Sequence, residues 1–90
     1  MIITFSFKGS IFGQNEDIQI DLEDNKSVND ALVAIITKIP SLDSLIFKEG
    51  KLRNDILVLV DKTDIISMNL LYMPLNDKQV ITVLPLAHGG

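Results

Sequence analysis

Apolar and polar side chains alternate along the first part of the chain. In the segment 2–8, Ile3, Phe5 and Phe7 fall on one face of an extended backbone and mostly polar residues fall on the other, which is the pattern of a half-buried strand. The segment 17–22 alternates in the same way, with three aliphatic residues facing inward. Glycine and polar residues separate the two segments and favour a turn. The pattern therefore predicts an antiparallel hairpin.

Apolar residues take up helical spacing in the segment 28–39. The apolar stripe comprises Val28, Ala31, Leu32, Ile35, Ile36 and Ile39. Ser27 can cap a free backbone N–H group, and Asp30 lies near the positive end of the helix dipole. Pro40 ends the helix, because the residue before a proline is disfavoured in the helical conformation. We expect this helix to pack its stripe against the hairpin.

The segments between this helix and the last strand are less regular. Four apolar residues that follow the helix are expected to be at least partly buried: Leu42, Leu45, Ile46 and Phe47. Residues 48–51 and 61–62 have turn chemistry, and the chain continues at 63–66 as a short strand or a connection. The sequence of the segment 67–73 is compatible with a loop and with a short helical turn. The segment 74–79 is interpreted as a polar connection.

All five residues of the strand predicted at 56–60 are apolar. One helix covers only one face of a sheet, so aliphatic side chains of this strand face away from the helix whichever way the strand is turned. In the last strand, predicted at 80–84, Val80, Thr82 and Leu84 share one face. An uncovered aliphatic patch indicates a protein-binding surface, unless the long loops fold over it. The order of elements predicts a single α+β domain with four to five strands packed on one main helix.

Composition excludes several kinds of chemistry. The chain has no cysteine, which excludes disulfides, thiolate metal sites and a cysteine nucleophile. His88 is the sole histidine and lies close to the last residue, so neither a multi-histidine metal site nor a catalytic triad is expected. The net charge of -4 argues against binding to a nucleic-acid backbone. Without a membrane span or a signal segment, we expect a cytoplasmic location and no direct contact with nucleic acid or membrane.

The sequence closes on two glycines, Gly89 and Gly90, shortly after Pro85. Glycine loses more backbone entropy on ordering than any other residue, and neither glycine has a side chain to bury. These residues therefore form either a frayed end or a tail that threads into a site too narrow for side chains. We expect residues 1–86 to form the domain and residues 87–90 to form a flexible tail.

Three motifs in the second half of the chain resemble the sulfur-carrier branch of the ubiquitin-like β-grasp family. They are Glu49-Gly50-Lys51-Leu52 before the aliphatic strand, Pro74-Leu75-Asn76-Asp77 before the last strand, and Val80 to Pro85 followed by a spacer and Gly89-Gly90. That branch contains the small subunit of molybdopterin synthase, the thiamine sulfur carrier and the ubiquitin-related modifier that serves tRNA thiolation. The ending His88-Gly89-Gly90 is most similar to the ubiquitin-related modifier. Two turns depart from the family pattern, at Asp61-Lys62 and at Lys78-Gln79.

The resemblance implies a β-grasp mixed sheet and a reactive main-chain carboxylate at Gly90. A ubiquitin-activating-like adenylyltransferase would join this carboxylate to AMP from ATP, with no cofactor bound permanently to the carrier. A sulfur donor such as a rhodanese or a persulfide enzyme would then give a thiocarboxylate, or a lysine of a target protein would form an isopeptide bond. Gly89 and His88 would thread into the active site of the partner. The resemblance implies docking through Leu84, and we expect Thr82, Leu57 and Leu59 to dock beside it.

Several functions stay open on the sequence. The preferred one is a carrier and modifier of the ubiquitin-related-modifier type, which works with tRNA-thiolation enzymes. An alternative is a small subunit that donates sulfur to molybdopterin together with the large subunit of molybdopterin synthase. A second alternative is a ubiquitin-like interaction module whose tail is never activated. A small enzyme is disfavoured, because no cluster of residues has the spacing for acid–base or nucleophilic work.

Overall fold

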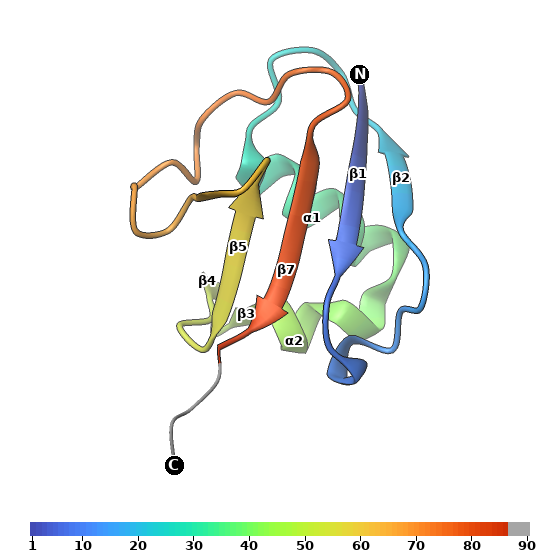
Figure 1. The fold of residues 1–90 in the computed structure, drawn as a ribbon, viewed down its shortest axis with the longest axis vertical. Helices are drawn as coiled ribbons and strands as arrows, with labels where there is room; N and C mark the ends of the chain where they lie inside the picture. Colours follow the sequence, from blue (N-terminus) through green and yellow to red (C-terminus); the bar gives the residue numbers. More distant parts are fainter. Residues whose placement is uncertain (87–90) are drawn as a thin grey trace.

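The computed structural model describes residues 1–86, and within them a β-sheet with helices on one side (Figure 1). The elements in chain order are β1 (Ile2–Phe7), η1 (Ser10–Phe12), β2 (Ile18–Asp21), α1 (Val28–Lys38), η2 (Pro40–Leu42), α2 (Asp43–Ile46), β3 (Phe47–Lys48), β4 (Lys51–Leu52), β5 (Ile56–Val60), β6 (Thr63–Asp64) and β7 (Val80–Pro85). The predicted strands and main helix are thus confirmed, with small differences at their ends.

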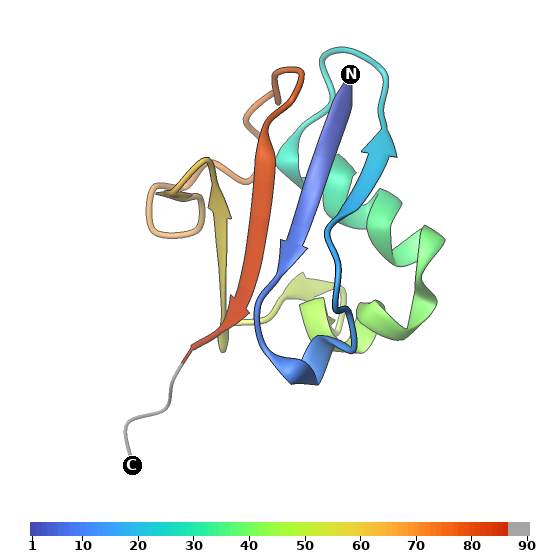
Figure 2. The same ribbon diagram turned by 45° about the vertical axis from the view of Figure 1, so that its right-hand side comes forward.

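The main sheet has five strands in the order β2-β1-β7-β5-β6. The first and last strands lie side by side in its centre and run parallel, whereas β2 pairs with β1, and β5 with β7 and β6, in antiparallel fashion. Figure 2 shows α1 along one side of this sheet while the other side carries no helix. The sheet is therefore mixed and the domain is α+β, as the sequence predicted.

The core lies between α1 and the covered face of the sheet. Strand side chains at Ile3, Phe5, Ile81 and Val83 are fully buried against the stripe of α1. Burial of this apolar surface is the main favourable term in folding. The sequence pattern identified these inward positions because strict alternation assigns one face to the core.

A capping box fixes the start of α1. The Oγ of Ser27 accepts a hydrogen bond of 3.1 Å from the N–H of Asp30, and the N–H of Ser27 donates one of 2.9 Å to the Asp30 carboxylate. These bonds satisfy two backbone donors that a helix start otherwise leaves without partners. They also lower the pKa of Asp30, chiefly through the bond from the Ser27 backbone.

The segment after α1 forms compact structure that the sequence only outlined. Pro40 opens a 3-10 turn, a single turn of helix follows, and β3 and β4 form a small separate hairpin. Leu42 and Ile46 are fully buried, and Leu45 and Phe47 are partly buried, as expected. This segment closes the end of the core that lies near the last residues of β7 (Figure 1).

The turn between β5 and β6 has a positive φ at both of its residues, 46° at Asp61 and 75° at Lys62. This backbone geometry suits the twist of a two-residue hairpin. The predicted tight turn is therefore confirmed, although neither residue is glycine. The Asp61 carboxylate also accepts the N–H of Val80 at 3.0 Å, which ties the turn to β7.

Two predictions about the connections need correction. The segment 63–66 is a strand only at Thr63–Asp64; Ile65, which follows, is fully buried. The segment 74–79 is not simply polar, because Leu75 is buried and its N–H donates to the carbonyl of Lys26 at 2.8 Å. The open segment 67–73 forms turns, not a helix, and lies beside the start of α1. These loops cover the rim of the core.

No helix within residues 1–86 is long and apolar enough to cross a membrane. In the same range, no group of three or more histidine, aspartate or glutamate side chains could hold a metal ion.

Candidate functional site

The face of the sheet that points away from α1 carries the predicted docking residues. Along β5, burial alternates so that the first, third and fifth residues are buried while Leu57 and Leu59 are partly exposed. Along β7, Ile81 and Val83 are buried and Leu84 is partly exposed. The structure thus settles the orientation of both strands, which the sequence left open for β5.

The strand register brings these residues together into one patch. Leu57 lies directly opposite Leu84, and Leu59 lies directly opposite Thr82. Directly opposed residues on one face of an antiparallel pair have Cβ atoms roughly 5 Å apart. The four predicted docking residues are therefore mutual neighbours, and we call them the outer patch. Its aliphatic part lies at the end of β7 from which the chain continues toward the tail.

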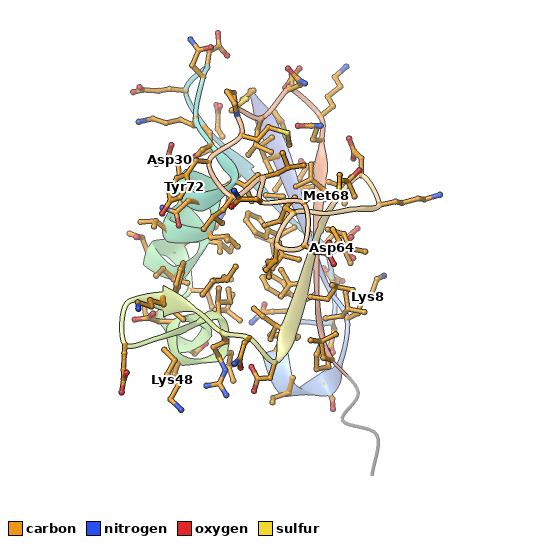
Figure 3. The ribbon with its side chains drawn as sticks, turned by 90° about the vertical axis from the view of Figure 1, so that its left-hand side faces the viewer. Lys8, Asp30, Lys48, Asp64, Met68 and Tyr72 are labelled. Atoms are coloured by element: carbon orange, nitrogen blue, oxygen red, sulfur yellow. The ribbon has the colours of Figure 1, made fainter. Side chains whose placement is uncertain are left out.

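Charged groups flank the outer patch. Lys8 follows β1, and its N–H donates to the carbonyl of Val83 at 2.8 Å, which sets Lys8 beside Leu84. On the other flank, Asp64 of β6 lies opposite Leu59. Figure 3 shows Lys8 on the sheet side of the molecule, whereas Asp30 and Lys48 lie on the helix side. The patch is thus an apolar surface with a cation on one flank and an anion on the other.

Backbone hydrogen bonds hold Asp64 in its charged form. Its carboxylate accepts the N–H groups of Ser67 at 3.2 Å and Ile66 at 3.0 Å. The bond from the Ser67 backbone is the main cause that lowers the pKa of Asp64, because these donors stabilise the carboxylate and not the neutral acid. Asp64 therefore stays negative across the neutral range.

The chain is held in place as far as Leu86. The Leu86 N–H donates to the carbonyl of Asp55 at 3.0 Å, one residue beyond the end of β7. The Asp55 carboxylate in turn binds the Nε and Nη2 atoms of Arg53 at 2.9 and 2.8 Å, and this partner raises the pKa of Arg53. The last strand is thereby fixed at the point where the tail begins.

Gly9 supports the end of β7 from the other side. Its φ is +108°, and a Cβ at this position would lie 3.1 Å from the Cδ of Pro85. A side chain there would be strained by the backbone and crowded by the proline ring. From the sequence, Gly9 belongs to the turn that follows the first strand, and its contact with Pro85 was not predicted. A glycine directly after a strand is the sequence signal that could have indicated a close approach of another segment at this position.

The reactive positions proposed from the sequence, Gly90, Gly89 and His88, lie outside the described residues. The described residues include the outer patch, which precedes the tail in the chain. What the described part offers is an aliphatic patch on the outer face of the sheet and an anchored end of β7. Binding is the chemistry that such an arrangement supports.

Comparisons with known proteins identify related folds. No protein-family model and no curated protein matches the chain. Among solved structures, it is similar to small archaeal modifier protein 1 from Haloferax volcanii, with a TM-score of 0.86 and 20% identity over 100% of both chains. It is also similar to Urm1 from Sulfolobus solfataricus, with a TM-score of 0.65 and 26% identity over 92% of this chain and 99% of that one.

A third similar structure is a putative molybdopterin converting factor, subunit 1, from Pyrococcus furiosus. The TM-score is 0.76 at 17% identity, over 96% of this chain and 98% of that one. These neighbours confirm the resemblance drawn from the sequence, since they include modifier proteins and a molybdopterin-related subunit. The chain therefore has the ubiquitin-like β-grasp fold.

Proposed function

We propose that this protein is a small ubiquitin-like sulfur carrier and modifier whose reactive group is the main-chain carboxylate of Gly90. The observation that carries the proposal is the outer patch: an aliphatic surface at the end of β7, directly before the tail, with Leu84 and Leu57 facing outward side by side. A docking face in this place would present the tail to another enzyme.

The carboxylate needs activation, because it is already negative and its leaving group would be oxide. In the proposed reaction, a carboxylate oxygen of Gly90 attacks the α-phosphorus of ATP in the active site of the partner, and pyrophosphate leaves. The outer sulfur of the donor's persulfide then displaces AMP and forms an acyl disulfide. A thiol of the donor or the activating enzyme attacks the inner sulfur, which releases the terminal thiocarboxylate and leaves a disulfide between that thiol and the donor. In the other fate, the amine of a target lysine displaces AMP and forms an isopeptide bond.

The glycines of the tail have a steric role in this scheme. A Cβ at Gly89 or Gly90 would obstruct the approach of ATP and of the nucleophile to the last carbonyl. His88 would enter the cleft with them. The carrier itself supplies no catalytic side chain, and ATP is consumed by the activating enzyme.

The proposed partners follow from this chemistry. They are a ubiquitin-activating-like adenylyltransferase and a sulfur donor such as a rhodanese or a persulfide enzyme. The final acceptor is either a tRNA-thiolation enzyme or a target lysine. The Urm1 neighbour supports this version at 26% identity.

A molybdopterin synthase small subunit is the second candidate. The Pyrococcus furiosus neighbour, with a TM-score of 0.76, supports this candidate through its fold. In this version the outer patch docks on the large subunit and the thiocarboxylate donates sulfur to the pterin precursor. Reconstitution with the large subunit and precursor separates the two: formation of molybdopterin supports this candidate, and sulfur delivery only to tRNA supports the first.

Intact-mass spectrometry of the protein from its own cells tests the common proposal. We expect a fraction in which one oxygen is replaced by sulfur, or conjugates with Gly90 linked to lysine. A terminus that is always unmodified would instead support an interaction module that is never activated.

Gly90→Ala provides the matched biochemical test. We expect the variant to fold as the wild type does, by circular dichroism and thermal melting, because Gly90 lies outside the domain proposed at 1–86. ATP–pyrophosphate exchange by the activating enzyme should fall by at least about tenfold, a loss of roughly 1.4 kcal/mol of transition-state stabilisation. Exchange at the wild-type rate would contradict the role of Gly90.

A further inference from the structure

A hollow of about 220 Å³ lies at the base of the tail, away from the outer patch. Ile11 of η1, Leu45 of α2, Arg53, Pro85 and Leu86 are among its walls. We call it the tail-base hollow. It brings together the first turn of the chain, the segment after α1 and the end of β7. Leu86, the last residue that the structure describes, lines its rim.

Most residues that line this hollow are apolar, and two of them are well exposed. Ile11 is 61% exposed and Leu86 is 41% exposed. Ile11 is nevertheless held in place, because the next residue, Phe12, is buried with its ring centroid 5.4 Å from that of Phe7. An exposed isoleucine on an anchored turn is a fixed apolar surface.

Hydrogen bonds keep the hollow from closing. The Arg53 guanidinium binds both carboxylate oxygens of Asp55, and its Nη1 donates to the carbonyl of Ser44 at 3.2 Å. This arrangement joins the α2 segment to the loop that leads into β5. Because Arg53 and Asp55 neutralise each other, the hollow offers no unbalanced charge to a ligand.

The short distance from Leu86 to the proposed reactive carboxylate limits how far a partner can lie from the tail-base hollow. Four residues, 87–90, separate Leu86 from the proposed reactive carboxylate. A fully extended segment of this length spans at most about 14 Å. An enzyme that receives the Gly90 carboxylate in a cleft must therefore come close to Leu86, which lines the tail-base hollow.

We propose that the activating enzyme inserts one apolar side chain, such as leucine, methionine or phenylalanine, into the tail-base hollow between Ile11 and Leu86. This inference rests on the proposed function. The outer patch and the tail-base hollow then hold the tail from two sides. An apolar side chain fits because most of the lining is apolar and, among residues 1–86, the two charged residues that line the hollow, Arg53 and Asp55, are paired with each other.

Ile11→Asp tests the inference in ATP–pyrophosphate exchange with the full-length chain and the adenylyltransferase of its own organism. We expect the KM for the carrier to rise at least about tenfold, as for a residue central to an interface, with kcat within about twofold because the chemistry is untouched. Ile11→Leu should restore the wild-type KM. Val33→Asp is the control, since Val33 is 46% exposed on α1, and it should leave the KM unchanged.

Each other outcome overturns the inference in a different way. An unchanged KM for Ile11→Asp, with an active wild type, removes the hollow from the interface and leaves the proposed function standing. No exchange with the wild type overturns the proposed function and this inference together. An equal rise in KM for Val33→Asp would mean that an added negative charge weakens binding wherever it is placed, and the hollow would have no specific role. A higher kcat/KM for Ile11→Asp would mean that residues 87–90 of the same chain occupy the hollow in the free protein. A wild-type dimer that Ile11→Asp loses in size-exclusion chromatography would mean that a second copy of the chain occupies it.

Discussion

Single residues of β7 differ in role according to the face they occupy. Ile81 and Val83 are fully buried, whereas Leu84, between Val83 and Pro85, faces outward beside Leu57. Alternation along the strand makes this assignment, because neighbouring side chains of a strand point to opposite faces. Leu84 is thus available to a partner at little expense to the core.

Leu84→Asp is expected to weaken the binding of the activating enzyme far more than it weakens the fold. A charge in the middle of an apolar interface should raise the Kd about tenfold or more, while the free energy of unfolding falls by about 1 kcal/mol. Titration calorimetry and urea unfolding measure the two quantities.

The control for this variant is Thr4→Asp, which lies on the same face of the sheet but opposite Val80, at the other end of β7 from Leu84. It should leave the affinity unchanged. Val83→Asp, by comparison, should unfold the domain because it buries a charge without a partner. If Leu84→Asp unfolded the domain in the same way, Leu84 would belong to the core and the outer patch would lose its central residue.

At the scale of elements, local signals predicted more than tertiary ones did. Ser27, Asp30 and Pro40 mark the ends of α1 through chemistry that acts within a few residues, and the structure confirms them. Phe12, Ile65 and Leu75 were not identified as core residues. Each lies in a turn or irregular segment, so its burial depends on distant neighbours and leaves no periodic pattern.

The candidate site shows the same division. The all-apolar strand at 56–60 predicted an uncovered aliphatic patch, because that pattern is a property of one strand, whereas Leu84 was named through the family resemblance. The tail-base hollow was not predicted, since it combines Ile11, Leu45 and Leu86 from three elements far apart in sequence. Gly90, Gly89 and His88 remain predictions.

The capping box of α1 gives an element-scale prediction about pH. The folded state lowers the pKa of Asp30 below its ordinary value of 3.8, so the charged form is stabilised by folding. This contribution to the free energy of unfolding is complete above the ordinary pKa and is lost as the pH falls through the lowered value. The gap in stability between the wild type and Asp30→Asn should therefore be larger at neutral pH than in acid.

Urea unfolding at a series of pH values measures this gap. Glu16→Gln, which removes an exposed carboxylate outside α1, is the control for the loss of one charge. Ser27→Ala should lower the free energy of unfolding by about 1 kcal/mol through the lost cap. A gap between wild type and Asp30→Asn that stays constant with pH would mean that the carboxylate does not stabilise the helix start through its charge.

At the scale of the whole molecule, the fold separates a stable body from the positions proposed to react. Among residues 1–86, the last hydrogen bond that anchors the end of β7 is the one from the Leu86 N–H to the Asp55 carbonyl. A chain cut after Leu86 should therefore keep the melting temperature of the full-length protein within about 2 °C, far less than the shift that 1 kcal/mol causes in a domain of this size. It should bind the activating enzyme but support no pyrophosphate exchange.

Differential scanning calorimetry and the exchange assay test this expectation. A chain cut after Pro85 is the matched comparison, because it also loses the bond from the Leu86 N–H and should melt at a lower temperature. If the chain cut after Leu86 melted well below the full-length protein, residues 87–90 would be part of the folded domain.

The parallel pairing of β1 with β7 also determines how the protein responds to mechanical force. The two strands are joined from Thr4 and Val80 to Phe7 and Val83, and β1 starts at one end of the pair while β7 leaves at the other. A pull between Met1 and the tail would load the bonds between these strands together, in shear, and would not open them one after another. We expect the domain to resist a pulling force between its two ends strongly. A protein joined to the tail should therefore unfold at a lower force than this domain does.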